Sequence, residues 1–178
     1  MRKLLISLGL LLLLLVSIPA FLLASGTTDS STLRMLFNSM MGIAGPAANS
    51  DIVRQQYNVP DGFTLELYDA NLPRARFLLF TPSGDLLVSR PHSGDILLLG
   101  RDADGDGKPD ARATLIEGLE RPLGMDISGG WLYIAESNRV SRIRFDSDSG
   151  TVDGALETVV EGLTDNGNHW SKTIRIGQ

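Results

Sequence analysis

A histidine near the end of the sequence has the clearest capacity for chemistry. His169 follows the short polar stretch Gly167-Asn168 and precedes Trp170–Ile176, whose alternating side chains are typical of a strand. Because histidine titrates near neutral pH, its imidazole can take a proton from a hydroxyl group, as oxidation of an alcohol or a sugar hemiacetal requires. The same spacing fits a structural histidine bonded to the backbone at a strand entry, so both interpretations stay open.

An arginine stands just before another expected strand. Arg121 lies in the stretch Gly118–Asp126, and a guanidinium at a strand entry can grip a planar carboxylate through two parallel hydrogen bonds. The alternative is a surface arginine that pairs with Glu120 or Asp126. Local spacing does not choose between these two hypotheses.

An acidic loop is the third candidate. Carboxylates alternate along Asp102, Asp104 and Asp106, and Asp110 follows them. In a tight loop such oxygens can converge on a hard cation, and the opening matches the first half of a calcium loop. The twelfth position, where a calcium loop requires a bidentate glutamate, is Ala113, so a solvated hairpin loop is the alternative.

Composition excludes several other classes of site. The sequence has 178 residues, of which 43% are hydrophobic, enough for one domain with a real core. It has no cysteine, which excludes disulfides, thiolate metal sites and a cysteine nucleophile. The net charge of −5 argues against non-specific nucleic-acid binding, so no nucleic-acid partner is expected. The sequence also lacks a phosphate-binding glycine loop, a metalloprotease motif and a nucleophile elbow.

The first residues predict export from the cytoplasm. Arg2-Lys3 is a short basic segment, and Leu4–Ala24 contains no charged residue. The helix-breaking Pro19 and the small residues at 24–26 fit a cleaved signal peptide. An uncleaved membrane anchor is slightly favoured, because about 20 apolar residues are enough to span a bilayer. In both cases we expect the rest of the chain in the cell envelope, on the periplasmic or extracytoplasmic side.

The chain is expected to divide into three parts. Residues 1–25 form the signal peptide or membrane anchor, residues 26–58 form a linker with a short helix, and residues 59–178 form the globular domain. Apolar residues at helical spacing predict that short helix over Leu33–Ile43. An ordinary packing helix is a simpler interpretation of it than a helix that rests on a membrane.

After residue 60 the sequence is a series of short runs typical of strands, bounded by Gly, Pro, Asp, Asn or Ser. The runs are Phe63–Tyr68, Ala75–Phe80, Leu86–Ser89, Ile96–Leu99, Ala113–Glu117, Gly124–Ile127, Leu132–Glu136, Val140–Phe145, Leu156–Val160 and Trp170–Ile176. No convincing helix interrupts them. The predicted fold class is therefore all-β.

The strands also repeat. Phe80, Ile127 and Ile176 occupy the matching position of three successive units, at spacings of 47 and 49 residues. A repeat of this length made only of strands is typical of β-propeller blades, with a meandering sandwich as the alternative. Two complete units and the opening strand of a third are present. We therefore expect a partial β-propeller of about the first two to three blades, from the N-terminal portion of a longer protein.

Such a fold predicts positions for two polar turns. Asn138 or Arg139, between two strands, would face a ligand if that turn lines the mouth of the central channel. His92, in Pro91–Gly94, fits an outer hairpin turn instead.

Two blocks of sequence carry a resemblance to a known family. They are GLERPLGMDISGGWLYIAESNRVSRIRF and GLTDNGNHWSKTIRIG, preceded by the acidic loop. Together they resemble the quinoprotein glucose/sorbosone dehydrogenase family, which includes the pyranose dehydrogenases dependent on pyrroloquinoline quinone (PQQ), over roughly Pro60–Gln178. The resemblance implies a six-bladed propeller that binds PQQ near its axis with calcium beside it.

The resemblance also implies roles for particular residues. His169 matches the family's catalytic base, which deprotonates a sugar hydroxyl as hydride passes to the quinone. Arg121 lies in the loop that contacts PQQ and would bind one of its carboxylates. Asn168 stands where some members carry an acidic partner of the histidine. The substrate would be a sugar or a small aldehyde, and an external electron acceptor would reoxidise the cofactor.

Two other hypotheses remain beside this one. The first is a non-catalytic propeller module that presents a binding surface at the membrane. The second is a calcium-dependent, lactonase-like propeller hydrolase, which inward-facing acidic and asparagine ligands would favour.

Overall fold

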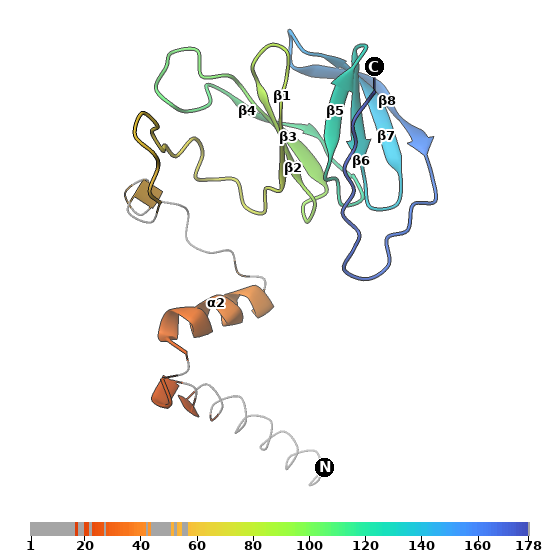
Figure 1. The fold of residues 1–178 in the computed structure, drawn as a ribbon. Helices are drawn as coiled ribbons and strands as arrows, with labels where there is room; N and C mark the ends of the chain where they lie inside the picture. Colours follow the sequence, from red (N-terminus) through yellow and green to blue (C-terminus); the bar gives the residue numbers. More distant parts are fainter. Residues whose placement is uncertain are drawn as a thin grey trace. The chain divides into compact units, whose positions relative to one another are not determined.

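The computed structural model describes residues 17, 20–21, 23–26, 28–41, 43, 51, 53–54 and 57–177. The chain divides into two compact units, Met1–Ala47 and Ala48–Gln178. The first contains one described helix of more than a few residues, and the second contains all the described strands (Figure 1).

The helix of the first unit is α2, Ser30–Met41. It begins after Asp29, whose carboxylate accepts a hydrogen bond of 2.7 Å from the backbone N–H of Thr32, as an N-cap residue does. This confirms the helix predicted over Leu33–Ile43. None of its residues is buried.

The hydrophobic helix expected over Leu4–Ala24 lies mostly outside the described residues. Among the residues that are described, no helix is both long enough and apolar enough to cross a bilayer.

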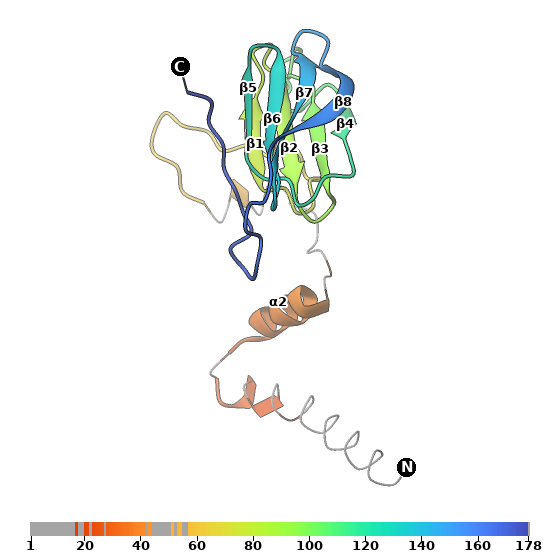
Figure 2. The same ribbon diagram turned by 90° about the vertical axis from the view of Figure 1, so that its right-hand side faces the viewer.

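The second unit consists of two four-stranded antiparallel sheets, which confirms the all-β prediction. Each sheet is a simple meander in chain order, β1-β2-β3-β4 and β5-β6-β7-β8. The bounds are β1 Phe77–Phe80, β2 Leu86–Arg90, β3 Asp95–Leu99, β4 Arg112–Ile116, β5 Met125–Ser128, β6 Trp131–Ala135, β7 Val140–Asp146 and β8 Thr151–Val160. Contacts join β1 to β5 and β4 to β8, so the sheets stack in the same strand order (Figures 1 and 2). They are the two complete repeat units, and the described residues form no closed ring.

The tightest hairpin joins β5 to β6 through two glycines. Gly129 and Gly130 have φ angles of 58° and 75°. A two-residue hairpin turn with positive φ at both positions matches the twist of the flanking strands, and glycine adopts it without a steric penalty.

The central strands of the first sheet are buried on both faces, whereas those of the second sheet are apolar on one face only. In β2 and β3, alternate residues enter two separate apolar clusters: Leu87 and Ile96 pack toward the second sheet, whereas Val88 and Leu97 pack on the outer side against the segment that contains Tyr68. Burial on both faces explains why these two strands are continuous apolar runs in the sequence.

In β6 and β7 the apolar residues alternate instead. Leu132, Ile134, Ile143 and Phe145 enter the cluster between the sheets. The residues between them face the outer side, where the guanidinium groups of Arg142 and Arg144 lie 4.1 and 3.9 Å from the ring centre of Trp131. The outer side of the second sheet is therefore polar and aromatic.

Two of the predicted strands are absent. Phe63–Tyr68 and Trp170–Ile176 form no strand ladder among the described residues. Trp170–Ile176 instead runs close along the start of β5, where the N–H of Gly124 donates a hydrogen bond of 3.0 Å to the carbonyl oxygen of Lys172. Alternation along a chain is local, but a strand also needs a partner.

Gly124 permits this close approach of backbone to backbone. A Cβ atom at position 124 would lie 2.7 Å from the Cα of Thr173 and 2.9 Å from the carbonyl oxygen of Lys172. Neither backbone atom can move away without displacing the segment.

We predict that Gly124→Ala displaces the 170–176 segment and destabilises the second unit by about 1–3 kcal/mol, as overpacking does. Hydrogen–deuterium exchange over residues 170–177 should speed up, and the urea midpoint measured by tryptophan fluorescence should fall. Gly177→Ala is the matched control, because nothing lies within 4 Å of its added Cβ. Equal effects of the two substitutions would contradict the packing described.

Candidate functional site

One end of the second unit gathers four connections from different parts of the chain. They are the β2–β3 turn, the β4–β5 connection, the β6–β7 turn and the segment after β8. The N–H of Leu119 donates to the carbonyl oxygen of Gly94 at 2.9 Å, and the N–H of Leu163 donates to that of Asn138 at 2.9 Å. These two bonds are equivalent, because donor and acceptor both advance by 44 residues along the sequence. The repeat therefore extends from the strands to the way this end is tied together, and we call it the site end.

Each sheet closes its turn at the site end with an ion pair of opposite polarity. In the first sheet Arg90 donates through Nε to Asp95 at 2.8 Å. In the second sheet the carboxylate comes first, and Arg139 donates through Nε to Glu136 at 2.6 Å. The two pairs do not hold the same place in their sheets: Arg90 is the last residue of β2 and Asp95 the first of β3, whereas Glu136 and Arg139 lie in the turn between β6 and β7.

Glu136 links two of the connections. Its side chain is fully buried, and besides Arg139 it accepts hydrogen bonds from the N–H of Glu120 at 2.6 Å and from the hydroxyl of Ser141 at 2.7 Å. Burial by itself raises the pKa of this carboxyl, but the bonds from Arg139, Ser141 and the Glu120 amide together hold the pKa below its ordinary value. Glu136 therefore stays ionised and fixes the residue that precedes Arg121.

Arg121 has a backbone conformation that non-glycine residues seldom adopt. Its φ is 50°, and Arg74, 47 residues earlier, has a φ of 61°. The guanidinium of Arg121 lies 5.7 Å from the ring centre of Trp170 and 3.8 Å from the carboxylate of Glu120, which is too long for a hydrogen bond. Asp126, the other expected partner, binds Arg175 and the N–H of Ile176 instead. Nearly half of the Arg121 side chain is exposed, so its donors can reach a ligand.

The structure brings His92 to the same place, which sequence analysis missed. The ring centres of His92 and Trp170 are 6.5 Å apart with the planes at 75°, an edge-to-face contact. His92 lies in the hairpin turn between β2 and β3, as predicted, and that turn belongs to the site end. The repeat could have predicted this position, because the turn that contains His92 in the first unit corresponds to the turn that contains Asn138 in the second.

His169 is exposed at the site end, in the connection after β8. From the equivalent leucines Leu119 and Leu163 to the matched isoleucines Ile127 and Ile176, this connection is five residues longer than the one that carries Arg121. Within the described part of the chain the imidazole makes no hydrogen bond or ion pair. It is adjacent in sequence to Trp170, the residue that contacts Arg121.

Of the two residues expected at a channel mouth, Arg139 is committed to the buried carboxylate of Glu136. The Asn138 side chain is exposed, and its carbonyl oxygen receives the bond from Leu163. The turn therefore stabilises the site end, and of the two expected residues Asn138 is the one with an exposed side chain.

The acidic loop lies away from this end. It joins the last residue of β3, Leu99, to the first of β4, whereas the β2–β3 turn precedes Asp95 at the other end of β3. Oxygens of Asp102, Asp104 and Asp106 lie within 4.8 Å of one another, as cation ligands would. A calcium ion held there would be separate from any ion at the site end.

Hydrogen bonds already order this loop. Asp102 accepts backbone bonds from Gly105 at 2.7 Å and Gly107 at 2.9 Å, and Asp110 accepts one from Ala103 at 3.0 Å. Burial by itself raises the pKa of Asp102, but the bonds from the Gly107, Gly105 and Asp106 amides hold that pKa below its ordinary value. The loop therefore presents ionised carboxylates, and calcium binding by the four aspartates stays a prediction.

Comparison with known proteins gives the family. A family model described as TrAA12-like matches residues 57–178. The chain belongs to the TrAA12-like family. No curated protein matches the chain.

Three solved structures that are similar to this TrAA12-like chain are much longer than it is. The holo form of the pyranose dehydrogenase PQQ domain from Coprinopsis cinerea is 23% identical with a TM-score of 0.57, over 65% of this chain and 28% of that one. The calcium and iodide structures of Trichoderma reesei Carbohydrate-Active Enzymes Family AA12 are 29% identical with TM-scores of 0.55. They cover 72% of this chain and 30% and 31% of theirs. The chain therefore spans less than a third of the length of these solved relatives.

The buried carboxylate at the site end leads to a prediction about stability. Glu136→Gln leaves Arg139 without its charged partner; because that guanidinium is 35% exposed, we take the cost as about 1.5–3 kcal/mol, the size typical of a hydrogen bond to a charged group. We expect a loss of that size by urea denaturation. Glu120→Gln is the control, because that carboxylate is half exposed and too distant from Arg121 for a strong pair, so its loss should cost less than about 1 kcal/mol.

The pH dependence supplies a second test of the same group. Because the folded-state pKa of Glu136 is lowered, its contribution to stability is present above the unfolded-state pKa and is lost as pH falls through the folded-state pKa. Glu136→Gln should remove this part of the acid sensitivity. An unchanged acid profile would mean that the ionised carboxylate does not hold the site end together.

Proposed function

We propose that this TrAA12-like chain forms part of a PQQ-dependent dehydrogenase that oxidises a hydroxyl group of a sugar. Likeness to the PQQ domain of a pyranose dehydrogenase and to family AA12 structures supports the proposal. The observation that carries it is the arrangement of Arg121, half exposed and beside the indole ring of Trp170, in the loops where an exposed histidine, His169, also lies.

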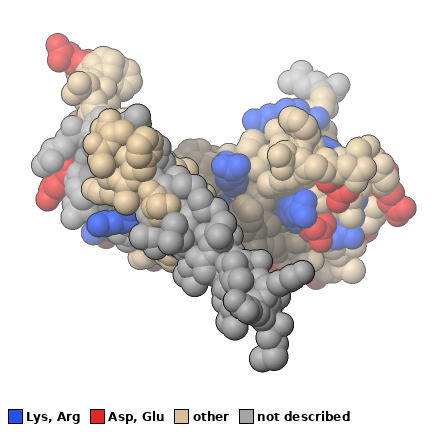
Figure 3. Space-filling model, turned by 90° about the horizontal axis from the view of Figure 1, so that it is seen from below, with Lys and Arg blue, Asp and Glu red and all other residues tan. Residues whose placement is uncertain are grey.

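The residues at the site end fit such a cofactor. PQQ is a planar quinone with carboxylate groups, and a guanidinium can grip a carboxylate through two parallel hydrogen bonds. Figure 3 views the molecule from below and shows basic and acidic side chains side by side on the strand-bearing unit, with uncharged surface between them. Arg121 would hold one carboxylate, with its own direction set by Trp170 and by the backbone fixed through Glu136. When bound, PQQ supplies the acceptor for the hydride of the substrate carbon.

The task of the chain's own residues is binding and proton transfer. The imidazole of His169 would accept the proton of the substrate hydroxyl, and it is suited to this because it is exposed and has no hydrogen-bond partner among the described residues. Its place in a longer connection lets it reach outward over the site end. Asn168 precedes it with an amide, so the histidine would act without a neighbouring carboxylate at that position.

The proposal includes a setting for the enzyme. The basic Arg2-Lys3 and the uncharged Leu4–Ala24 support export and membrane anchoring, which would place the catalytic part in the periplasmic or extracytoplasmic cell envelope. A sugar or small aldehyde would be the substrate, and an external electron acceptor would take the electrons from the reduced cofactor.

The proposed roles of the two residues predict different defects. In the protein that carries residues 57–178, reconstituted with PQQ and calcium, His169→Ala should lower the rate of aldose-dependent dye reduction by about 10²–10⁴, with PQQ binding nearly unchanged. Arg121→Ala should weaken PQQ binding, with turnover recovered at excess PQQ. Asn166→Ala, in the same connection as His169, controls for disturbance of the loop.

Turnover of His169→Ala close to that of the unmodified protein would contradict the assignment of His169 as the base. Failure of the unmodified protein to bind PQQ would reject the dehydrogenase and leave the non-catalytic binding module as the better hypothesis.

The acidic loop is tested separately. If Asp102, Asp104, Asp106 and Asp110 bind calcium, Asp104→Asn should weaken terbium luminescence and remove calcium-dependent thermal stabilisation, because the carboxylates are the ligands that a hard cation prefers. Asp148→Asn is the control, since that residue lies exposed in the β7–β8 turn. Equal terbium binding by the two variants would show that the loop is an ordinary solvated hairpin loop.

A further inference from the structure

The helix of the first unit exposes an apolar stripe. Leu36, Phe37, Met40 and Met41 are 56%, 54%, 72% and 58% exposed. With Leu33 they follow the spacing i, i+3, i+4, i+7 and i+8, which places them along one face of α2. Soluble proteins rarely leave a contiguous stripe of this kind uncovered, so it marks a surface that binds something.

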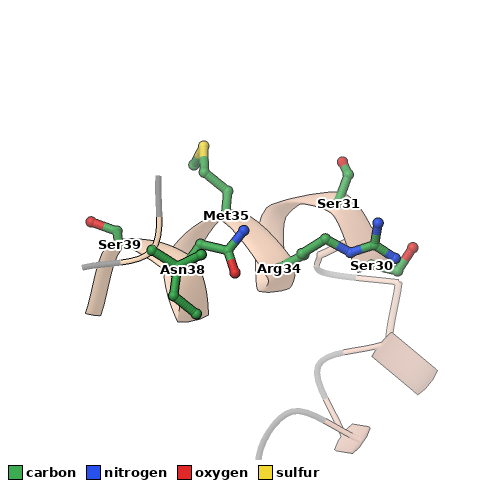
Figure 4. Close-up of a pocket in the computed structure, with 7 residues that line it drawn as sticks. Ser30, Ser31, Arg34, Met35, Asn38 and Ser39 are labelled. Atoms are coloured by element: carbon green, nitrogen blue, oxygen red, sulfur yellow. The ribbon is translucent and has the colours of Figure 1, made fainter. Parts of the chain in front are cut away.

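The other side of the helix is polar. Figure 4 shows Ser30, Arg34 and Asn38 following one another along it, with Met35 beside Ser31 on a neighbouring row. Ser39 continues the polar side, and a shallow groove of about 480 Å³ runs along these residues. Arg34 is the one charged residue of the helix. The helix is therefore amphipathic, with a weakly charged polar face.

The sequence before the helix indicates what covers the stripe. The uncharged run Leu4–Ala24 ends six residues before Ser30, and an extended chain of that length reaches about 20 Å. If the run is anchored in a bilayer, as proposed above, the start of α2 stays within about 20 Å of the membrane surface. Phe21 and Leu23, before the helix, are also apolar and are 70% and 44% exposed.

We propose that α2 lies in the membrane interface, with Leu33, Leu36, Phe37, Met40 and Met41 among the lipid acyl chains. A helix of this pattern buries its apolar face about 5–10 Å below the headgroups. The near absence of charge means that apolar burial, and not attraction to anionic lipid, drives the contact. This inference rests on the proposed anchoring of residues 4–24, and it adds that a second, surface-lying helix orients the chain.

The test uses the full chain, which has no cysteine of its own. Single variants Phe37→Cys and Met40→Cys report on the apolar face, and Ser31→Cys and Ser39→Cys are matched controls on the polar face. Each carries an environment-sensitive fluorophore, and each is reconstituted into phosphatidylcholine vesicles with and without phosphatidylglycerol. Iodide measures access from water, and nitroxide-labelled lipid measures access from the bilayer.

We expect labels at 37 and 40 to be quenched severalfold more by nitroxide lipid than labels at 31 and 39, with the reverse order for iodide. The pattern should be the same in both lipid mixtures, because α2 has a single charge. Equal exposure of all four labels to iodide would overturn the proposal. Labels at 37 and 40 shielded from both quenchers would also overturn it, since a protein groove would then cover the stripe.

Alkaline carbonate extraction separates this inference from the anchor itself. Release of the chain by carbonate, with the lipid pattern intact before extraction, would reject the anchor and support α2. Retention of the chain without the lipid pattern would support the anchor and reject α2.

Discussion

The packing of one four-stranded sheet against another is the constraint on which the rest of the second unit depends. A single meander has two faces and cannot bury either alone, so each sheet needs the other to remove its apolar side chains from water. The shared layer takes residues from both sheets: Leu87, Ile96, Leu119, Met125, Leu132, Ile134, Ile143 and Phe145. Because β1 stacks on β5 and β4 on β8, equivalent turns of the two sheets meet at one end, and that end becomes the candidate site.

The outer faces of the stacked sheets differ. On the first sheet Leu78 and Phe80 are 56% and 70% exposed, and they line an apolar groove of about 510 Å³ with Tyr68 and Leu86. On the second sheet Trp131 is covered by two guanidinium groups, which can stay hydrated while they shield the ring. The outer face of the first sheet is therefore buried at β2 and β3 but apolar and open along β1, and the outer face of the second sheet is compatible with water.

The site end contains a strained backbone at Arg121 and a hydrogen-bond network that holds the residue before it. Arg121 has a left-handed backbone conformation, which costs of order 1 kcal/mol or more for a residue with a Cβ. The preceding residue, Glu120, is bound twice: its N–H donates to Glu136, and its carbonyl oxygen accepts from the N–H of Ser137. The fully buried carboxylate of Glu136, in the turn between β6 and β7, thus positions Arg121 in the connection between the two sheets. Trp170 then contacts that arginine from a third part of the chain.

Much of this could be predicted from the sequence, because strands, turns and helices are encoded locally. Alternating runs, turn residues and a 47-residue repeat were sufficient for β1 to β8 and for the division into two sheets, and helical spacing was sufficient for α2. The same alternation failed at Phe63–Tyr68 and Trp170–Ile176, where a strand would need a distant partner that the described chain does not supply. Arg121 and His169 could also be selected from the sequence, because the patterns that indicated them lie in the residues next to them along the chain.

Only the tertiary structure decided which distant residues surround them. His92 lies 78 positions before Trp170 in the sequence, and their contact exists because the sheets stack in register. Glu136 was only the last residue of a predicted strand in the sequence, and its burial as an anion depends on the groups of Glu120, Arg139 and Ser141 that donate to it. Local sequence determines a residue's conformation and charge, but burial and contact depend on which surfaces the folded sheets bring together.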